Sequence, residues 1–311
     1  MSALALVFVF LACLALTAGS VAVSIKIAHR WEIYDHPDMP RKLQDRPVPK
    51  LGGVAVAIAF LAVTLTFFGL TGRTGDLGLA LGVLVPAVLM AFLGFLDDRR
   101  HLDPYVRLAF QAGMAGLVWV TGTRVDVTGN SLIDFLLFIL WAMLVVNGIN
   151  LLDNSDGLAA STTLVAALGA AIIAVLAGQE LVSILAIALA GAALGFLWHN
   201  WHPARVYLGD AGAYFLGFLL AVLVVRLRPD KLDEWQGIVV ALLLVALPLL
   251  DTFFVISRRL LAGTHPFTAG RDHLSHLLQE RGTSIRLSVI QLQSISVVSA
   301  LLAVVLVVAS W

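Results

Sequence analysis

The sequence predicts an all-α, polytopic integral membrane protein with about ten transmembrane helices. Of its 311 residues, 60% are hydrophobic and only 13% are charged, whereas a soluble domain carries about 25% charge. The mean hydropathy is +0.95, and apolar segments of about the ~20 residues that cross a bilayer recur along the whole chain. No long polar block separates them, so we predict one transmembrane domain spanning residues 1–311.

Two further features of the composition exclude other classes of protein. The single cysteine, Cys13, lies inside an apolar segment, which excludes a disulfide framework and a cysteine-based metal site. The formal net charge is zero, so nothing indicates nucleic-acid binding.

Ten apolar segments are predicted to be helices. The first resembles a secretory signal peptide in position, but it lacks a basic start and a small-residue cleavage site, and its apolar stretch is too long. We therefore interpret it as the first transmembrane helix. The segments lie near residues 3–25, 51–70, 77–96, 104–121, 131–147, 158–178, 181–198, 211–227, 236–257 and 287–310.

The connections between these segments fall into two chemically different sets. One set carries 15 of the 20 Lys and Arg residues, all eight histidines and most of the polar clusters. The positive-inside rule places this set of loops on the cytoplasmic face of the membrane. These loops lie near residues 26–50, 97–107, 147–157, 199–210 and 258–286.

The most informative motif occupies residues 147–158, between two apolar segments. Asn147, Asn150 and Asp153 follow one another at intervals of three residues, which places them on one face if the segment is helical. Asp156 precedes Gly157 where the next helix begins. Charged side chains near lipid are costly and usually functional. The alternative is a polar turn that only caps two helices.

A second motif is the carboxylate pair Asp97 and Asp98, which follows an apolar segment. Adjacent carboxylates repel each other unless a cation or a shared proton compensates. Mg²⁺ prefers such oxygen ligands and commonly uses only one or two from the protein. A solvated helix end is the alternative interpretation.

Three more polar clusters belong to the same set of loops. The segment 35–53 contains basic residues that could hold phosphate, among them Arg41 and Lys42, and ends in Gly52 and Gly53. Segment 198–213 contains small residues around Asp210 that would let an anionic ligand approach a helix start. Segment 265–276 ends in histidines that suit a diphosphate better than zinc.

Together these clusters supply acidic groups for a hard metal ion, basic groups for phosphate and apolar helices for a lipid. The combination predicts phosphoryl transfer between a soluble nucleotide and a membrane lipid at the inner leaflet. In this chemistry the protein mainly positions the reacting groups and neutralises charge.

The motifs, taken in order, resemble those of the polyprenyl-phosphate N-acetylhexosamine-1-phosphate transferases, which include WecA-type, TagO-type and MraY enzymes. The resemblance extends from about residue 35 to 286 and rests on five motifs in sequence. It implies transfer of a sugar 1-phosphate, preferentially GlcNAc-1-phosphate, from a UDP-N-acetyl-sugar to undecaprenyl or another polyprenyl phosphate, with release of UMP. The implied cofactor is Mg²⁺, with Mn²⁺ as the alternative ion. The implied partners are the nucleotide sugar, the lipid carrier, membrane lipids and a second subunit, because family members often dimerise.

The resemblance also implies a role for individual residues. Asp210 corresponds to the principal Mg²⁺ ligand, with Asn150 as a second. The catalytic residues it implies are Asp97, Asp98, Asp153, Asp156 and His273. The substrate-binding residues are Arg41, Lys42, Asn147, Asn200, Tyr207, Arg271 and His276.

Two positions depart from the family pattern. Asn154 stands where many members have glycine, and Ser275 stands where many have histidine. Because the late motif lacks a run of consecutive histidines, the MraY-type donor, UDP-MurNAc-pentapeptide, is the second choice. A membrane transporter and an inactive homologue remain as alternatives from other classes.

Overall fold

A computed structural model of the protein describes residues 2–36, 46–72, 74–229, 231–268 and 270–310. Each of the ten predicted apolar segments is helical, and the ninth is broken into two helices. The helices of these segments are α1 (Ala3–Trp31), α2 (Gly52–Thr71), α3 (Thr74–Arg100), α4 (Pro104–Val120), α5 (Ser131–Leu152), α6 (Leu158–Leu176), α7 (Glu180–Asn200), α8 (Gly209–Val225), α9 (Glu234–Leu244), α10 (Ala246–Leu261) and α12 (Ile285–Ala309).

Two short features were not predicted from the sequence. A two-stranded antiparallel hairpin, β1 (Tyr34–Asp35) and β2 (Val48–Pro49), pairs Tyr34 with Pro49. The short helix α11 (Leu274–Glu280) follows the histidine-containing loop. Both features are too short to show a hydrophobic period in the sequence.

The helix lengths agree with a polytopic membrane protein. Seven of the described helices are long and apolar enough to cross a membrane, and the number rises to eight if α9 and α10, bent by 75°, count as one span. Helices α4 and α8 have 17 residues each, which at about 1.5 Å per residue is somewhat shorter than the ~30 Å hydrocarbon layer. The prediction of an all-α transmembrane fold is confirmed.

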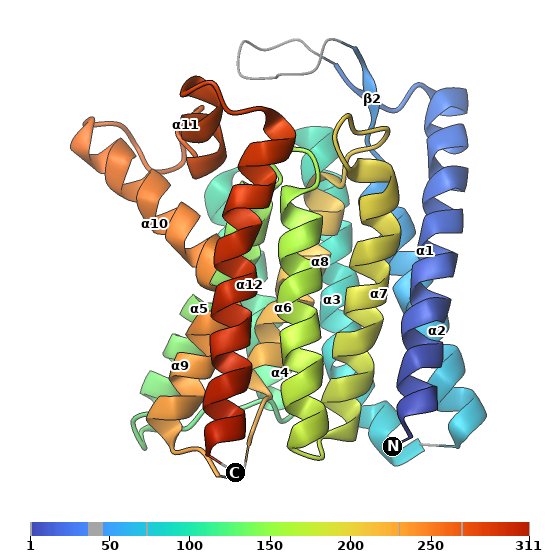
Figure 1. The fold of residues 1–311 in the computed structure, drawn as a ribbon, viewed down its shortest axis with the longest axis vertical. Helices are drawn as coiled ribbons and strands as arrows, with labels where there is room; N and C mark the ends of the chain where they lie inside the picture. Colours follow the sequence, from blue (N-terminus) through green and yellow to red (C-terminus); the bar gives the residue numbers. More distant parts are fainter. Residues whose placement is uncertain (1, 37–45, 73, 230, 269, 311) are drawn as a thin grey trace.

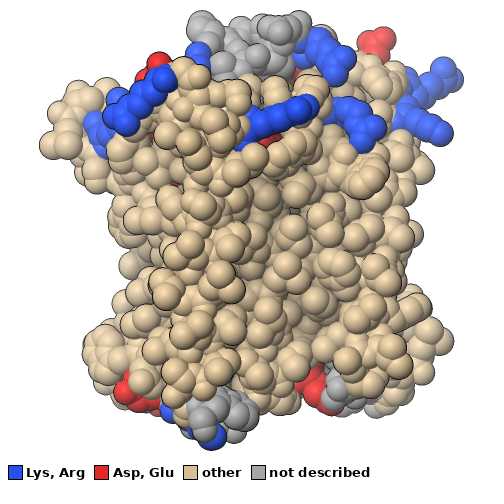
Figure 2. Space-filling view, viewed as in Figure 1, with Lys and Arg blue, Asp and Glu red and all other residues tan. Residues whose placement is uncertain are grey.

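The helices form a bundle whose two ends differ in charge. Both chain termini lie at one end, and β2 and α11 lie at the other, from which α10 leans outward (Figure 1). Lys and Arg gather mainly at the end with β2 and α11, while the middle of the bundle is nearly free of charge (Figure 2). We call this end the basic end. The unequal distribution of Lys and Arg between the two ends agrees with the predicted division of the connecting loops into a basic set and a set with few basic residues.

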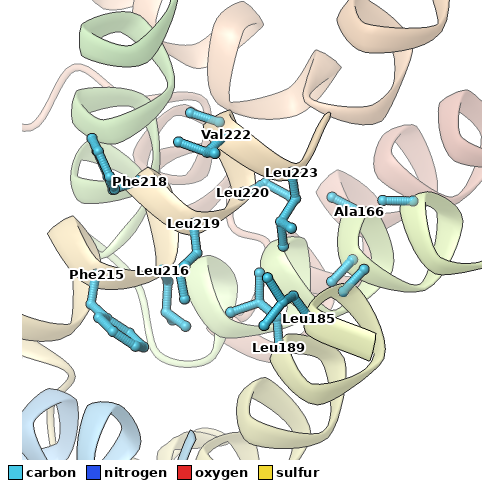
Figure 3. Close-up of a cluster of buried hydrophobic side chains, with 14 of the residues drawn as sticks. Ala166, Leu185, Leu189, Phe215, Leu216, Phe218, Leu219, Leu220, Val222 and Leu223 are labelled. Atoms are coloured by element: carbon cyan, nitrogen blue, oxygen red, sulfur yellow. The ribbon is translucent and has the colours of Figure 1, made fainter. Parts of the chain in front are cut away.

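Helix α8 is the centre of the core. All its residues except Asp210 are buried, and its leucines and phenylalanines contact neighbours such as Leu185 and Leu189 of α7 (Figure 3). A helix that is apolar on all sides requires such an enclosed position. The core thereby holds the start of α8, with Asp210, at the basic end.

Glycines bring α2, α3 and α8 close together beside Asp210. A Cβ atom at Gly53 would overlap the backbone of Gly212, and one at Gly94 would overlap the carbonyl of Asp210. Gly94 and the Gly53–Gly212 contact therefore serve the packing of α2 and α3 against the start of α8. The first amides of α8 are occupied as well, because those of Asp210 and Ala211 donate to Asp98.

Candidate active site

A cavity of about 680 Å³ opens among the loops of the basic end. Its walls come from the hairpin, the α5–α6 junction, the segment before α8 and the loop around α11. The polar and charged lining residues are Asp35, Arg46, Lys50, Asn150, Asp153, Asn154, Ser155, Asp156, Asn200, His202, Tyr207, Asp210, His273 and His276.

The α5–α6 junction places the central motif in this wall. Helix α5 continues through Leu152, so Asn150 is helical and its Nδ2 atom donates to Oδ1 of Asp210 at 2.6 Å. The chain then turns at Gly157, whose φ of 80° favours glycine, and α6 begins. The amide of Gly157 donates to the side-chain oxygen of Asn200 at 2.9 Å. The motif therefore forms a wall of the cavity in addition to a helix turn.

Asp156 and Asn200 attach this junction to the segment before α8. One carboxylate oxygen of Asp156 lies 2.7 Å from Nδ1 of His202 and accepts from the amide of Ala204 at 2.9 Å. Asn200 also donates to the carbonyl of Val206 at 2.9 Å. Both predicted side chains line the cavity, and their hydrogen bonds join the α5–α6 junction to the segment before α8.

Tyr207 lies between the hairpin and the start of α8. Its amide donates to the carbonyl of Pro49, and its carbonyl accepts from the amide of Gly52. Burial, followed by the charge of Asp156, raises the pKa of the Tyr207 phenol, so the ring stays neutral. A neutral aromatic ring in the cavity wall suits stacking against a nucleobase.

The two adjacent carboxylates of α3 have different environments. Asp97 is buried and is bonded to Arg107, to the hydroxyl of Tyr214 and to the amide of Leu102, at 2.8–2.9 Å. It does not line the cavity. The charge of Asp97 is therefore paired with Arg107, and its carboxylate oxygens are hydrogen-bonded within the helix bundle.

Asp98 lies directly behind the cavity wall. It accepts from the first amides of α8 and forms a 2.7 Å ion pair with Nζ of Lys50, which does line the cavity. Burial would lower the pKa of Lys50, but the charges of Asp98 and Asp210 outweigh it and raise the pKa. Lys50 therefore remains a cation at neutral pH.

The late loop contributes two histidines to the cavity wall. His273 Nδ1 lies 2.7 Å from Oδ2 of Asp251, and the ring centroids of His273 and His276 are 5.4 Å apart. Burial, and then the charges of His273 and Arg271, lower the pKa of His276 to about 4, so this ring is neutral at neutral pH. Arg271 itself is exposed and does not line the cavity.

Asn147, another predicted substrate contact, is not part of the cavity lining. Asn147 is one turn before Asn150 on α5, but its side chain pairs with Gln111 of α4, at 2.7 Å from Nδ2 to Oε1, and does not line the cavity. Arg41 and Lys42 lie outside the described residues.

The two departures from the family pattern contact each other. The hydroxyl of Ser275 donates to Oδ1 of Asn154 at 2.6 Å, across 121 residues of sequence. Ser275 is fully buried, and Asn154 lines the cavity. The two substitutions thus form one contact, which joins α11 to the central motif.

Asp251 is a residue that the sequence analysis missed. Its carboxylate is 1% exposed, within the apolar helix α10, and it binds the histidine loop. The available signal was a carboxylate inside a predicted transmembrane segment, which is rare without a function. Lys50 was not singled out either, because the sequence offers several basic residues in the segment 35–53 and nothing in it distinguishes this one.

The donor set of the cavity fits Mg²⁺ better than a softer metal. Among the described residues, no three His, Cys, Asp or Glu side chains form a preformed metal cage. Mg²⁺ needs none, because it usually takes one or two carboxylates together with water and substrate phosphate. Burial, and next the charge of Asp210, raise the pKa of Asp153 well above its ordinary value. A cation would relieve this concentration of negative charge.

Sequence comparisons agree with this combination of an α-helical membrane fold and a polar cavity. Residues 80–228 match the profile of Glycosyl transferase family 4. A probable undecaprenyl-phosphate N-acetylglucosaminyl 1-phosphate transferase of Bacillus subtilis is 31% identical over 90% of this chain and 79% of its own length. The chain therefore belongs to this family of membrane glycosyltransferases.

Two further relatives cover much of the chain. The decaprenyl-phosphate N-acetylglucosaminephosphotransferase of Mycobacterium leprae is 30% identical over 84% of this chain and 73% of its own length. A phospho-N-acetylmuramoyl-pentapeptide-transferase of Streptococcus thermophilus is 29% identical over 72% of both chains.

Proposed function

We propose that the protein transfers GlcNAc-1-phosphate from UDP-GlcNAc to undecaprenyl phosphate or a related polyprenyl phosphate and releases UMP. The observation that carries this proposal is the gathering of Asp153, Asp156 and Asp210 with Lys50 and two histidines in one cavity of a membrane bundle. The names of two relatives, from Bacillus subtilis and Mycobacterium leprae, specify the same sugar and class of lipid acceptor.

The reaction is a phosphoryl-group substitution. An oxygen of the lipid phosphate attacks the β-phosphorus of the nucleotide sugar and forms a new P–O bond. The bond from this phosphorus to the bridging oxygen breaks, and UMP leaves with that oxygen. A phosphate monoester has a second pKa of about 6 and is largely dianionic at neutral pH, so the nucleophile needs no strong base.

The side chains in the cavity match the charges of this reaction. Lys50, held by Asp98, and the histidines of the late loop are placed to bind the diphosphate and the charge that develops on the leaving UMP. Tyr207 offers a neutral ring to uracil. Asp210 and Asn150 would hold Mg²⁺, or Mn²⁺ in its place, and the ion would neutralise phosphate charge.

We propose that the reaction takes place at the cytoplasmic face of the bacterial inner membrane. Support comes from the cavity lying at the basic end, where most Lys and Arg residues gather (Figure 2). Cytoplasmic loops carry such an excess of basic residues. The nucleotide sugar would then enter from the cytosol, and the lipid phosphate from the inner leaflet.

The second candidate donor is UDP-MurNAc-pentapeptide. The observation in its favour is the Streptococcus thermophilus relative, whose name specifies that type of transfer. The late motif of the present chain has Ser275 between leucine and histidine, and this serine is committed to Asn154. We therefore place GlcNAc first.

The deciding experiment incubates purified protein with undecaprenyl phosphate, Mg²⁺ and a panel of UDP-sugars, and measures UMP. We expect UMP with UDP-GlcNAc and none after chelation of the divalent ion. Asp210→Ala should reduce the rate by at least about 100-fold, because it removes charge stabilisation at the phosphates.

Asp103→Asn is the matched control for this variant. It removes a carboxylate from the same end, where Asp103 caps α4, and asparagine is an equally good cap. It should retain normal activity. UMP release that survives Asp210→Ala, or UMP release only with UDP-MurNAc-pentapeptide, would contradict the assignment.

A further inference from the structure

Asp251 is a buried carboxylate with both oxygens committed to the histidine loop. Oδ2 lies 2.7 Å from Nδ1 of His273, and Oδ1 accepts from the amide of Leu274 at 2.8 Å. The residue is 1% exposed and lies in the apolar helix α10. Burial of a carboxylate costs free energy unless the group is hydrogen-bonded. The contacts with His273 and Leu274 therefore account for an aspartate at this position.

The contact determines which nitrogen of His273 is left for a ligand. A carboxylate oxygen only accepts, so Nδ1 carries the proton in this pair. His273 lines the cavity, and Nε2 is its other ring nitrogen. Nε2 can then meet a ligand in either protonation state, as a donor in the cationic ring and as an acceptor in the neutral one.

A second ionic contact from the same helix fixes the start of this loop. The Nε and Nη2 atoms of Arg259 bind the two oxygens of Asp272 at 2.7 and 2.8 Å, and Nη1 donates to the carbonyl of Pro266. Asp251 and Arg259 are eight residues apart on α10, close to the same face of the helix. Arg259 therefore holds the loop before His273, and Asp251 holds it at His273 and Leu274.

Helix α10 also packs closely against α5, the helix that carries the central motif. A Cβ atom at Gly148 of α5 would lie 3.0 Å from Cβ of Pro248 and 3.2 Å from Oγ1 of Thr252. Gly148 is two residues from Asn150. This close packing of α10 on α5 therefore sets where Asp251 lies relative to Asn150 and Asp153.

We propose that Asp251 is a positioning residue, which holds the His273 imidazole with Nδ1 toward α10 and Nε2 free to contact the diphosphate of the donor. The identity of the ligand, the diphosphate of the donor, rests on the proposed function. The orientation of the His273 ring does not. Asp251 acts only through His273 and does not touch the substrate.

The kinetic test is a double-mutant cycle with Asp251→Asn and His273→Gln. Asp251→Asn alone should lower kcat/KM for UDP-GlcNAc by about 10–100-fold, the range known for partners that orient metal-bound imidazoles. In the His273→Gln background it should change kcat/KM by less than about twofold, because the group it positions is gone. An equal loss in both backgrounds would overturn the proposal.

Thr252→Val is the matched control. Thr252 is the next residue of α10, it is buried, and its hydroxyl donates to the carbonyl of Pro248 and not to the loop. Valine has nearly the shape of threonine, so the packing of α10 against Gly148 is kept while the hydrogen bond to Pro248 is lost. This variant should lower thermal stability and leave kcat/KM unchanged. A purely structural role of Asp251 would make Asp251→Asn behave like this control, with lost stability and unchanged kcat/KM.

A second measurement does not require activity. In protein labelled with ¹⁵N in the imidazole rings, the His273 resonances are identified by their loss in His273→Gln. Nδ1 should be protonated in the parent protein, and Asp251→Asn should change the tautomer populations. Unchanged resonances would reject the proposal even in an active enzyme. If the parent shows this response but releases no UMP, the proposed function fails and the orientation of His273 stands.

Discussion

At the scale of single residues, neighbouring positions of one motif take on separate tasks. Asp97 neutralises Arg107 inside the bundle, whereas Asp98 binds the first amides of α8 and Lys50. A carboxylate at a helix N-terminus is favoured by the partial positive charge there. Asp98 therefore stabilises the backbone that presents Asp210, and it also holds a lysine at the cavity.

The contact between Asn154 and Ser275 can be tested by stability measurements. We expect Ser275→Ala and Asn154→Ala each to cost about 1 kcal/mol of unfolding free energy, the usual net value of a hydrogen bond. The double variant should cost less than the sum, because both changes remove the same bond. Denaturant or thermal unfolding in detergent measures all three variants.

A distant pair supplies the reference for this cycle. The side chain of Gln293 donates to Thr162 at 2.7 Å and to the carbonyl of Leu158, both on α6, so Gln293→Ala combined with Ser275→Ala should be additive. Additivity in the Asn154–Ser275 cycle itself would show that the two residues are energetically independent.

At the scale of helices, close packing of glycines places Asp210. Gly94 of α3 lies so close to the Asp210 carbonyl that α3 and α8 have no room for a side chain between them. Interiors are packed too tightly to absorb even a methyl group against backbone.

We therefore expect Gly94→Ala to destabilise the protein by about 1–3 kcal/mol and to reduce UMP release, because α8 must shift away from α3. Gly113→Ala is the matched control. Gly113 is also inside a helix, but a Cβ atom there would meet nothing within 4 Å. That variant should gain up to about 1 kcal/mol from helix propensity. Thermal unfolding and UMP release measure both, and equal behaviour of the two variants would refute the packing argument.

At the scale of the whole molecule, the charge of the two ends and the position of the cavity agree. Asp98 of α3, Asn150 of α5 and Asp210 of α8 meet at the basic end, although they are far apart in sequence. A transporter would instead place its charged site near the middle of the bilayer. That middle region is nearly free of charge in the view of Figure 2.

The orientation in the membrane can be tested by labelling single cysteines. Cys13 is the only cysteine and is buried, so the parent protein should not react with a membrane-impermeant maleimide. Arg281→Cys, exposed at the basic end, should be labelled in inverted vesicles and not in intact cells. Asp126→Cys, exposed at the opposite end, should show the reverse pattern. Labelling of Arg281→Cys in intact cells would place the cavity outside the cell.

The sequence by itself determined the ten apolar segments, the unequal distribution of basic residues and the presence of polar motifs at one end. These properties are local, because hydropathy and loop charge depend on residues close together in the chain. Gly157 is similarly local: its place between a polar motif and an apolar segment marks the turn.

Only the tertiary structure decided which of these motif residues share a cavity. Asn147 and Asn150 differ by one helical turn, yet one pairs with Gln111 and the other with Asp210. The partners of Asp251 and Ser275 likewise belong to other segments, 22 and 121 residues away. Such contacts depend on how separate helices pack and register against each other, and the period of any single helix does not contain that information.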